Sequence, residues 1–233
     1  MNKRPSRSVV WLALMSGGIA LTLFSSPRLP LVVVCAGDSI MRPVPAHFRT
    51  LAPGEGLDLD IREWAQGGLD SKTYLDFFRR NLEGWAGTKA DAILLQLGTN
   101  DALPLAEGKR TPEEFRAGMI AILAEFQKFR EPGARRPVLL LATVPYFCDR
   151  PESAAKNKMV DAVINPALKE IAASEGAILV DQYSILKNRP DYYDPDCVHP
   201  NAAGEIALAR NWLRALRASL DIYLRGERPK GRS

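Results

Sequence analysis

The sequence predicts an α/β fold, a three-layer α/β/α sandwich with a five-stranded, mostly parallel sheet. Two observations predict this class. Short apolar runs alternate along the chain with stretches of helical character, as they do in repeated βαβ units. Polar residues typical of reactive sites directly follow these runs, which is where ligands collect in parallel sheets. With 233 residues, 46% of them hydrophobic and 25% charged, the chain is expected to form one soluble globular domain.

The five apolar runs are the expected strands. They comprise residues 31–36, 57–62, 90–97, 137–143 and 177–180. Because parallel strands need crossover connections, and because these crossovers are right-handed, helices are expected between the strands and on both faces of the sheet.

Four longer stretches are expected helices, in addition to a first helix that contains His47. They comprise residues 71–85, 111–130, 152–174 and 202–220. The clearest begins with Thr111 as N-cap, Pro112 at the first helical position and Glu114 two positions later, which is the pattern of a capping box. Its apolar residues recur at helical spacing and predict a face packed on the core, not a cofactor site.

The first 28 residues predict an export signal or a short membrane anchor. A cationic start precedes an apolar stretch over residues 9–24. As a helix this stretch would span about 24 Å, against a hydrocarbon core of about 30 Å. In either case the positive end stays inside, and residues 29–224 are expected to form an extracytoplasmic domain that is periplasmic, secreted or membrane-anchored.

The net charge of +4 is concentrated at the two ends of the chain. Basic residues gather in the first seven positions and again in residues 225–233, which are expected to be a disordered basic tail. The body between them is therefore not basic, and no nucleic-acid partner is expected.

Ser39, in the tripeptide GDS directly after the first run, is a candidate for a nucleophile or for a helix N-cap. A serine nucleophile needs a base within hydrogen-bond reach and a third group that orients the base. The chain has two histidines. His47 lies in a Pro-rich segment, where a structural or surface role is expected. His199 follows Asp196 by three residues, so that one turn brings the carboxylate to Nδ1 and leaves Nε2 for Ser39 Oγ.

An oxyanion hole needs at least two donors aimed at the developing negative charge. Asn100, in GTND after the third run, offers its side-chain amide, and Gly68, after the second run, offers a backbone N–H. Ser39 offers its own backbone N–H. We expect Ser39 to fill two roles, capping the first helix with its backbone while its hydroxyl attacks. Each feature alone indicates only a cap, a turn or a flexible loop. Their joint order indicates acyl transfer to water.

Four blocks of the sequence, around Ser39, Gly68, Asn100 and His199, resemble those of the SGNH hydrolase superfamily, the GDSL esterases and lipases, in the same order. The resemblance covers residues 31–220. It implies a flavodoxin-like fold, a catalytic triad of Ser39, His199 and Asp196, an oxyanion hole of Ser39, Gly68 and Asn100, and no cofactor.

Two positions depart from the pattern of that superfamily. The second block often carries Asn a few residues before its glycine, whereas this chain has WAQGG, and Gly68 is taken as the donor in preference to Gly67. The residue after Asp196, often glycine in similar proteins, is Cys197. Cys148 and Cys197 both lie in loops expected at the same end of the sheet, so a disulfide between them is a hypothesis that the sequence leaves open, and Cys35 is expected to be buried in the first strand.

The expected activity is hydrolysis of an ester through an acyl-enzyme intermediate. The segment from residue 181 to residue 204 resembles members that act on acetylated carbohydrates, so an O-acetyl group on a glycan is the first candidate substrate. Tyr146 and Tyr193 are the candidate substrate-binding residues, as a rim on which a sugar stacks; loop packing is the alternative.

Two other functions compete with this hypothesis. One is a lysophospholipase or thioesterase that acts on longer acyl chains, and the other is a non-catalytic envelope glycan-binding protein. A metal hydrolase is not indicated, because two histidines without HExxH or paired Cys motifs provide no metal site. The expected partner is a small-molecule or glycan ester, with membrane contact only through the N-terminal segment.

Overall fold

The structure is a computed structural model that describes residues 29–129 and 136–224. The predicted export segment and the predicted basic tail lie outside these described residues. Within them, no helix combines the length and the apolar composition needed to cross a membrane.

The predicted five-stranded sheet is confirmed, and its strands are all parallel, in the order β2-β1-β3-β4-β5. The strands are β1 Leu31–Gly37, β2 Leu59–Ala65, β3 Ala92–Gln96, β4 Val138–Ala142 and β5 Ile178–Val180. Only β2 is displaced from its expected place: it begins and ends a few residues later than predicted. Gly37 pairs with Ala65 on one side and Gln96 on the other, so that β1, β2 and β3 end at the same edge.

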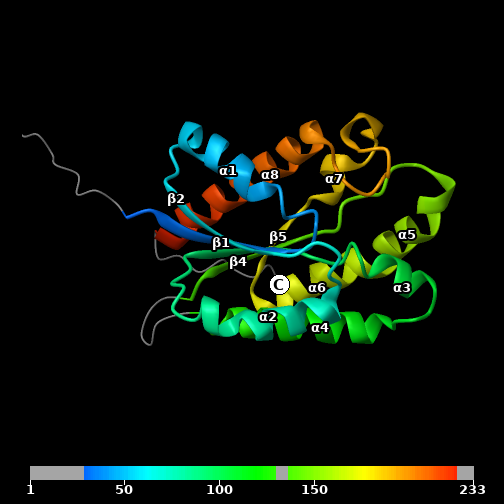
Figure 1. Cartoon of the computed structure of the whole chain (residues 1–233), viewed down its shortest axis with the longest axis horizontal. Helices are drawn as coiled ribbons and strands as arrows, with labels where there is room; N and C mark the ends of the chain where they lie inside the picture. The colour runs from blue at the N-terminus through cyan, green and yellow to red at the C-terminus, as the bar shows by residue number, and fades with distance from the viewer. Residues whose placement is uncertain (1–28, 130–135, 225–233) are drawn as a thin grey trace, which may run out of the picture.

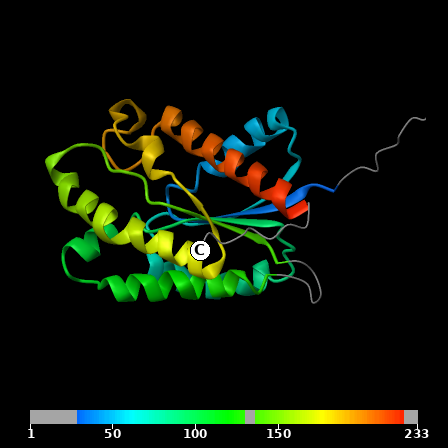
Figure 2. The same cartoon turned by 180° about the vertical axis from the view of Figure 1, so that it is seen from behind.

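Helices cover both faces of the sheet and complete the predicted three-layer sandwich (Figure 1). They are α1 Val44–Leu51, α2 Ser71–Trp85, α3 Ala102–Ala106, α4 Pro112–Phe126, α5 Ala154–Met159, α6 Asn165–Glu175, α7 Tyr183–Leu186 and α8 Ala202–Leu224. Figure 2 shows the same layers from behind, with α1 and α8 on one face of the sheet and α4 and α6 on the other.

Two buried clusters hold the layers together. One lies between the sheet and α2, α4 and α6, and contains Phe78, Phe115 and Leu168. The other lies under α1 and α8, and contains Phe48 and Trp212. Burial of such apolar side chains is the main stabilising term of the fold, at about 25 cal/mol for each Å² removed from water.

The predicted ends of the helices are confirmed where local capping is strong. The helix α2 spans the predicted residues, and Asp70 caps it by accepting the backbone N–H groups of Lys72 and Thr73. The helix α4 begins as predicted, with Thr111 and Glu114 forming the capping box.

The expected helix over residues 152–174 is a composite instead. It contains a 3₁₀ turn at Pro151–Ser153, then α5, a π-helical segment at Val160–Ile164, and α6. Pro166 lies in the first turn of α6. A proline has no N–H to donate and its ring collides with the carbonyl four residues back in a straight α-helix, so the wider π turn accommodates it.

The expectation that Ser39 caps the first helix is wrong. Two turns follow β1, with Met41 N–H donating to Asp38 and Val44 N–H donating to Met41, and α1 begins only at Val44. A helix starting at Ser39 would need the N–H of residue 43 to bond the Ser39 carbonyl, and residue 43 is a proline. Ser39 therefore lies in a turn.

Candidate active site

The turn that carries Ser39 is held against the neighbouring strand β3. Gly37, the last residue of β1, has a φ of 145°, and a β-carbon there would lie 1.9 Å from the carbonyl oxygen of Gln96. Only glycine permits this approach. The N–H of Asp38 donates to the same carbonyl at 3.0 Å, and Asp38 Oδ1 accepts the N–H of Ile40 at 3.0 Å. Ser39 is thereby fixed at the carboxyl edge of the sheet.

The structure brings Ser39, His199 and Asp196 into one line of hydrogen bonds. His199 Nε2 lies 2.9 Å from Ser39 Oγ, and His199 Nδ1 lies 2.6 Å from Asp196 Oδ2. With a proton on Nδ1, the ring donates to the carboxylate and Nε2 accepts from the serine hydroxyl. This is the arrangement in which a histidine can remove the hydroxyl proton.

Asp196 is held ionised by its own loop. Its Oδ1 accepts the N–H groups of Val198 and His199, each at 2.9 Å. Burial of the carboxyl group raises its pKa. The hydrogen bonds from the His199 ring and from these two N–H groups together lower the pKa by more, so that the pKa of Asp196 is about 2. The carboxylate therefore stays charged at neutral pH and favours a proton on Nδ1.

The loop of Asp196 and His199 is closed at its base. Tyr193 and Pro200 form an antiparallel bridge, and the N–H of Asp194 donates to the His199 carbonyl at 2.8 Å. Just beyond, Asn201 Oδ1 accepts two N–H groups at the start of α8. The histidine thus comes from a short loop anchored on the first turn of a long helix.

The three predicted oxyanion donors lie in loops at the same edge. Asn100 donates one hydrogen of its amide to the Leu69 carbonyl at 2.9 Å, which leaves the second hydrogen for a ligand. The backbone N–H groups of Ser39 and Gly68 make no hydrogen bond among the described residues. Gly68 has a φ of 79°, a conformation that favours glycine, while a β-carbon at Gly67 would lie 3.7 Å from Ser39 Cβ. Gly68 remains the predicted donor.

A buried polar cluster that the sequence analysis missed connects the second and third blocks. Asp101 is fully buried and accepts the N–H of Ser71 at 2.9 Å and its hydroxyl at 2.7 Å. Arg110 makes a charge-assisted hydrogen bond to Asp101 and an ion pair of 3.0 Å with Asp70. The cluster fixes the start of α2 against the loop of Asn100. In the sequence Asp101 resembles a turn residue, and no local pattern links it to Arg110.

Asp38 is a second buried carboxyl group, next to Ser39 in the chain. Burial raises its pKa to about 7, against the lowering effect of the Ile40 N–H and of Thr99. Its Oδ2 atom has no hydrogen-bond partner within the described part of the chain.

The two candidate rim tyrosines have different surroundings. The Tyr193 side chain is only 9% exposed and packs with Ile40 and Leu186, and its hydroxyl donates to the Tyr146 carbonyl. Its ring is therefore part of the loop packing, and the expected stacking role for Tyr193 is not supported. Tyr146 presents its hydroxyl to Asp149 Oδ1 at 2.5 Å and remains the candidate.

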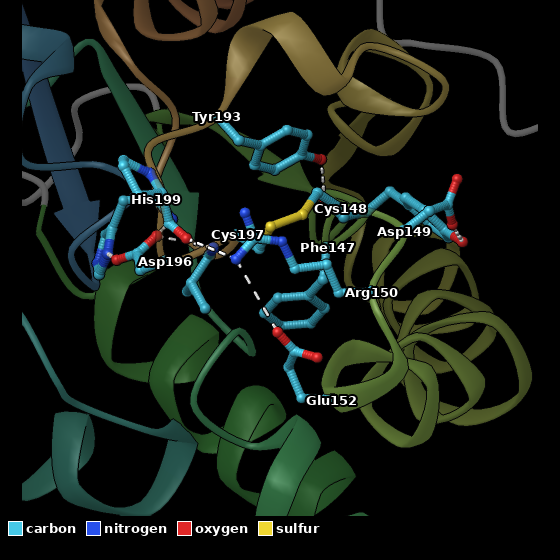
Figure 3. The surroundings of a disulfide bond; sticks show 12 residues. Phe147, Cys148, Asp149, Arg150, Glu152, Tyr193, Asp196, Cys197 and His199 are labelled. Atoms are coloured by element: carbon cyan, nitrogen blue, oxygen red, sulfur yellow. Dashed lines mark hydrogen bonds and ion pairs between the residues drawn. A yellow bond between two sulfur atoms is a disulfide. The ribbon is translucent and has the colours of Figure 1, made fainter.

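The structure contains the hypothesised disulfide between Cys148 and Cys197, with their Cα atoms 5.0 Å apart (Figure 3). Cys35 is a buried free thiol, as expected. His47 Nε2 lies 3.0 Å from Glu205 Oε2, so this contact joins α1 to α8, in agreement with a structural role. Among the described residues, no group of His, Cys, Asp and Glu side chains is arranged to hold a metal ion.

Comparison with known proteins identifies the family. The model of the GDSL-like lipase/acylhydrolase family matches residues 35–205, which contain Ser39, Gly68, Asn100, Asp196 and His199. No curated protein sequence matches the chain closely enough to count as a relative.

Solved structures resemble the fold at low sequence identity. The lipase Lip_vut3 from a goat rumen metagenome has a TM-score of 0.65 at 18% identity, covering 79% of this chain and 97% of its own. The esterase EstA from Pseudoalteromonas sp. has a TM-score of 0.62 at 15% identity, covering 82% and 98%. The acetylxylan esterase Axe2 from Geobacillus stearothermophilus has a TM-score of 0.60 at 20% identity, covering 80% and 94%. These likenesses establish the shared three-layer fold.

Proposed function

Since the chain belongs to the GDSL-like lipase/acylhydrolase family and is a serine ester hydrolase, we propose that Ser39 is its nucleophile and that an acyl-enzyme forms on Ser39 Oγ. The observation that carries the proposal is the unbroken line of hydrogen bonds from Asp196 through His199 to Ser39. A serine that only filled a turn would not need a histidine oriented by an ionised carboxylate.

The proposed reaction has two halves. In the first, Ser39 Oγ attacks the ester carbonyl while His199 Nε2 takes the hydroxyl proton, and the ionised Asp196 stabilises the imidazolium that results. The C–O bond to the alcohol then breaks, and Nε2 returns the proton to the departing oxygen. In the second half, water loses a proton to Nε2, attacks the acyl group and releases the acid, and Ser39 recovers its proton.

Negative charge develops on the carbonyl oxygen in both halves. We assign its stabilisation to the backbone N–H groups of Ser39 and Gly68 and to the free amide hydrogen of Asn100. These donors are fixed before the reaction: Asn100 by its bond to the Leu69 carbonyl, and the second block by Asp101. Donors held in advance lower the barrier because they need no reorganisation in the transition state.

The proposed substrate is a short acyl ester, with an O-acetyl group on a carbohydrate as the first candidate. A polar side chain lies close to Ser39: Arg42 is exposed, and a β-carbon at Gly67 would lie 3.7 Å from both Arg42 Nη1 and Ser39 Cβ. Tyr146 adds a half-buried aromatic ring that packs edge-on against Tyr183 and whose hydroxyl donates to Asp149 Oδ1. A guanidinium beside the proposed nucleophile suits a sugar alcohol better than a long acyl chain, and one structural neighbour is named as an acetylxylan esterase.

We also propose that the domain works outside the cytoplasm. Disulfides persist in oxidising compartments and are rare in the cytosol, so the Cys148–Cys197 bond supports export. The cationic and apolar residues that precede the domain in the sequence support the same location.

Hydrolysis of p-nitrophenyl acetate, butyrate and octanoate by the purified protein tests the proposal, beside Ser39→Ala and His199→Ala. We expect kcat to fall by about 10³-fold or more in both variants, since each removes a member of a unit that acts together. Acetate is expected to be the preferred acyl group. Preference for octanoate would favour the longer-chain alternative, and equal activity in all three proteins would exclude Ser39 as nucleophile.

The alcohol that carries the acyl group is identified with natural esters. We expect release of acetate from acetylated xylo-oligosaccharides and no release of fatty acid from lysophosphatidylcholine. The reverse pattern would replace the carbohydrate substrate by a lipid without changing the proposed mechanism.

A further inference from the structure

The disulfide lies inside the loop that carries the proposed base. Cys197 directly follows Asp196 and comes two residues before His199, and it is bonded to Cys148 in the loop after β4 (Figure 3). The disulfide therefore joins two loops that are 49 residues apart in sequence. It does so at a residue that lies between Asp196 and His199 in the chain.

Little packing holds Asp196 and His199 in place. Their side chains are 50% and 44% exposed. Exposed side chains on a loop keep much of their rotational freedom unless the backbone beneath them is fixed. The geometry at Ser39 therefore depends on what holds the backbone of this loop.

Cys197 has a backbone conformation that a residue with a β-carbon rarely adopts. Its φ is 58°, in the left-handed region. Such a conformation persists only where the surroundings impose it. Here the Cys197 N–H donates to the Asp194 carbonyl at 3.0 Å, the Cys148 N–H donates to the Cys197 carbonyl at 3.3 Å, and the side chain is tied by the disulfide.

The other end of the disulfide is anchored on α5. The Phe147 N–H donates to Asn157 Oδ1 at 2.9 Å, and Asn157 Nδ2 donates back to the Phe147 carbonyl at 3.0 Å. Asn157 is itself buried. Arg150, from the same loop, donates to the Pro195 carbonyl at 2.8 Å. Hydrogen bonds thus hold the backbone of the Cys148 loop in place, and the disulfide links Cys197 to that loop.

We propose that the Cys148–Cys197 disulfide is a positioning device for His199. By holding residue 197 in the left-handed conformation, it keeps the N–H groups of Val198 and His199 on Asp196, and it keeps Nε2 of His199 in reach of Ser39 Oγ. The proposal rests on the proposed function, because it acts through the same histidine and serine.

Two double variants separate the covalent tie from the conformation that it imposes. Cys148→Ser/Cys197→Ala removes the disulfide and leaves a β-carbon at a left-handed position. Cys148→Ser/Cys197→Gly removes it too, but glycine adopts this φ without strain. With p-nitrophenyl acetate, we expect the alanine variant to lose about 10- to 100-fold in kcat with KM within about 2-fold of the wild type. The glycine variant is expected to regain much of the lost kcat.

Cys35→Ala is the matched control for the loss of a cysteine. Cys35 is buried in β1, and burial raises the pKa of its thiol to about 12. Its replacement is expected to lower the melting temperature while kcat of the folded protein stays unchanged. The melting temperature and circular dichroism of every variant are measured in parallel, so that kcat is compared among folded proteins.

Reduction of the wild-type protein provides a second measurement if a variant fails to fold. Dithiothreitol supplies two electrons and two protons, the disulfide becomes two thiols, and the reagent becomes a cyclic disulfide. We expect kcat to fall on reduction and to recover on reoxidation, whereas reduction leaves kcat of Cys148→Ser/Cys197→Gly unchanged.

The outcomes separate this proposal from the proposed function. The positioning role is overturned if both double variants, or the reduced wild type, keep the wild-type kcat while Ser39→Ala is inactive. The mechanism through the left-handed conformation of residue 197 is overturned if the glycine variant loses as much kcat as the alanine variant. If Ser39→Ala itself matches the wild type, the proposed function fails first.

Discussion

The side chain of Asn100 has two roles in this account: one amide hydrogen bonds a neighbouring loop, and the other is proposed to bind the oxyanion. Its amide donates one hydrogen to the Leu69 carbonyl at 2.9 Å and holds the other free at the edge of the sheet. The sequence predicted the role from the residue type and its place after the third run, but the bond to Leu69 depends on how two loops meet. That contact explains how a flexible amide is aimed.

The first prediction concerns this amide. Asn100→Ala is expected to lower kcat by about 10²- to 10³-fold, because it removes one donor to the developing oxyanion. Steady-state kinetics with p-nitrophenyl acetate measure the effect. Asn81→Ala is the control, since the Asn81 amide is exposed and, within the described part of the chain, donates only to the Phe77 carbonyl of its own helix. An unchanged kcat in Asn100→Ala would remove Asn100 from the oxyanion hole.

The second prediction concerns Asp38 and pH. Burial raises the pKa of Asp38 to about 7 in the folded protein, above about 3.9 for an unfolded aspartate. Between these two values the folded state binds more protons, so the contribution of Asp38 to stability falls as pH rises, and the loss is complete above pH 7. Asn cannot ionise, so Asp38→Asn should remove this part of the pH dependence.

Urea unfolding of both proteins at pH 4.5 and pH 7.5 tests this expectation. The free energy of unfolding should shift in favour of the Asn variant on going to the higher pH. All other titrating groups are shared by the two proteins and cancel in the comparison. An equal change in both proteins would mean that Asp38 does not titrate in this range in the folded state.

At the scale of elements, the junction of β1 with β3 sets the position of the turn that carries Ser39. Gly37 lets the end of β1 approach the Gln96 carbonyl, and that same carbonyl accepts the Asp38 N–H. The GDS tripeptide thus has a structural role of its own. The glycine allows the close approach of the strands, the aspartate closes the turn, and the turn holds the serine at the edge of the sheet.

The third prediction tests that junction. Gly37→Ala places a β-carbon 1.9 Å from the Gln96 carbonyl oxygen, which also accepts the Asp38 N–H, and is expected to destabilise the protein by about 4 kcal/mol. Gly56→Ala is the matched control, because Gly56 has a φ of 71° but open space around its α-carbon. It should cost only about 1 kcal/mol. Equal costs in chemical denaturation would mean that β1 and β3 are not held this close.

Element prediction from the sequence succeeded where the signal is local and failed where it is not. The capping box of α4 and the apolar runs of the strands lie within a few residues and were found. The π-helical segment at Val160–Ile164 was missed, since Pro166 is compatible with a helix start as well as with a bulge. The short helices α3 and α7 span too few residues to show a period.

At the scale of the whole molecule, the parallel sheet explains why a site spread over the chain was predictable. Each candidate residue follows its own strand or lies in the last loop, and parallel strands end at one edge, so the order of blocks implied their proximity. The hydrogen bond between His199 and Ser39 agrees with that expectation. The contacts that hold the loops of the candidate site could not be predicted. Asp101 and Arg110 form an ion pair, but no sequence motif links these two residues.

Burial separated the candidate tyrosines in a way that the sequence does not encode. Tyr146 and Tyr193 both lie in loops at the reactive edge, and residue type alone favours both as sugar contacts. The structure packs Tyr193 under the loops, with its hydroxyl on the Tyr146 carbonyl. Aromatic side chains serve core and ligand equally well, so only their three-dimensional surroundings distinguish the two uses.

The central claim is that Ser39, activated by His199, is the nucleophile. The most direct test is the intact mass of the protein after incubation with a fluorophosphonate, followed by peptide mapping. We predict one adduct, on the peptide that contains Ser39, absent from Ser39→Ala and formed far more slowly in His199→Ala. An adduct that persists in Ser39→Ala, or one that maps to another residue of the wild-type protein, would contradict the claim.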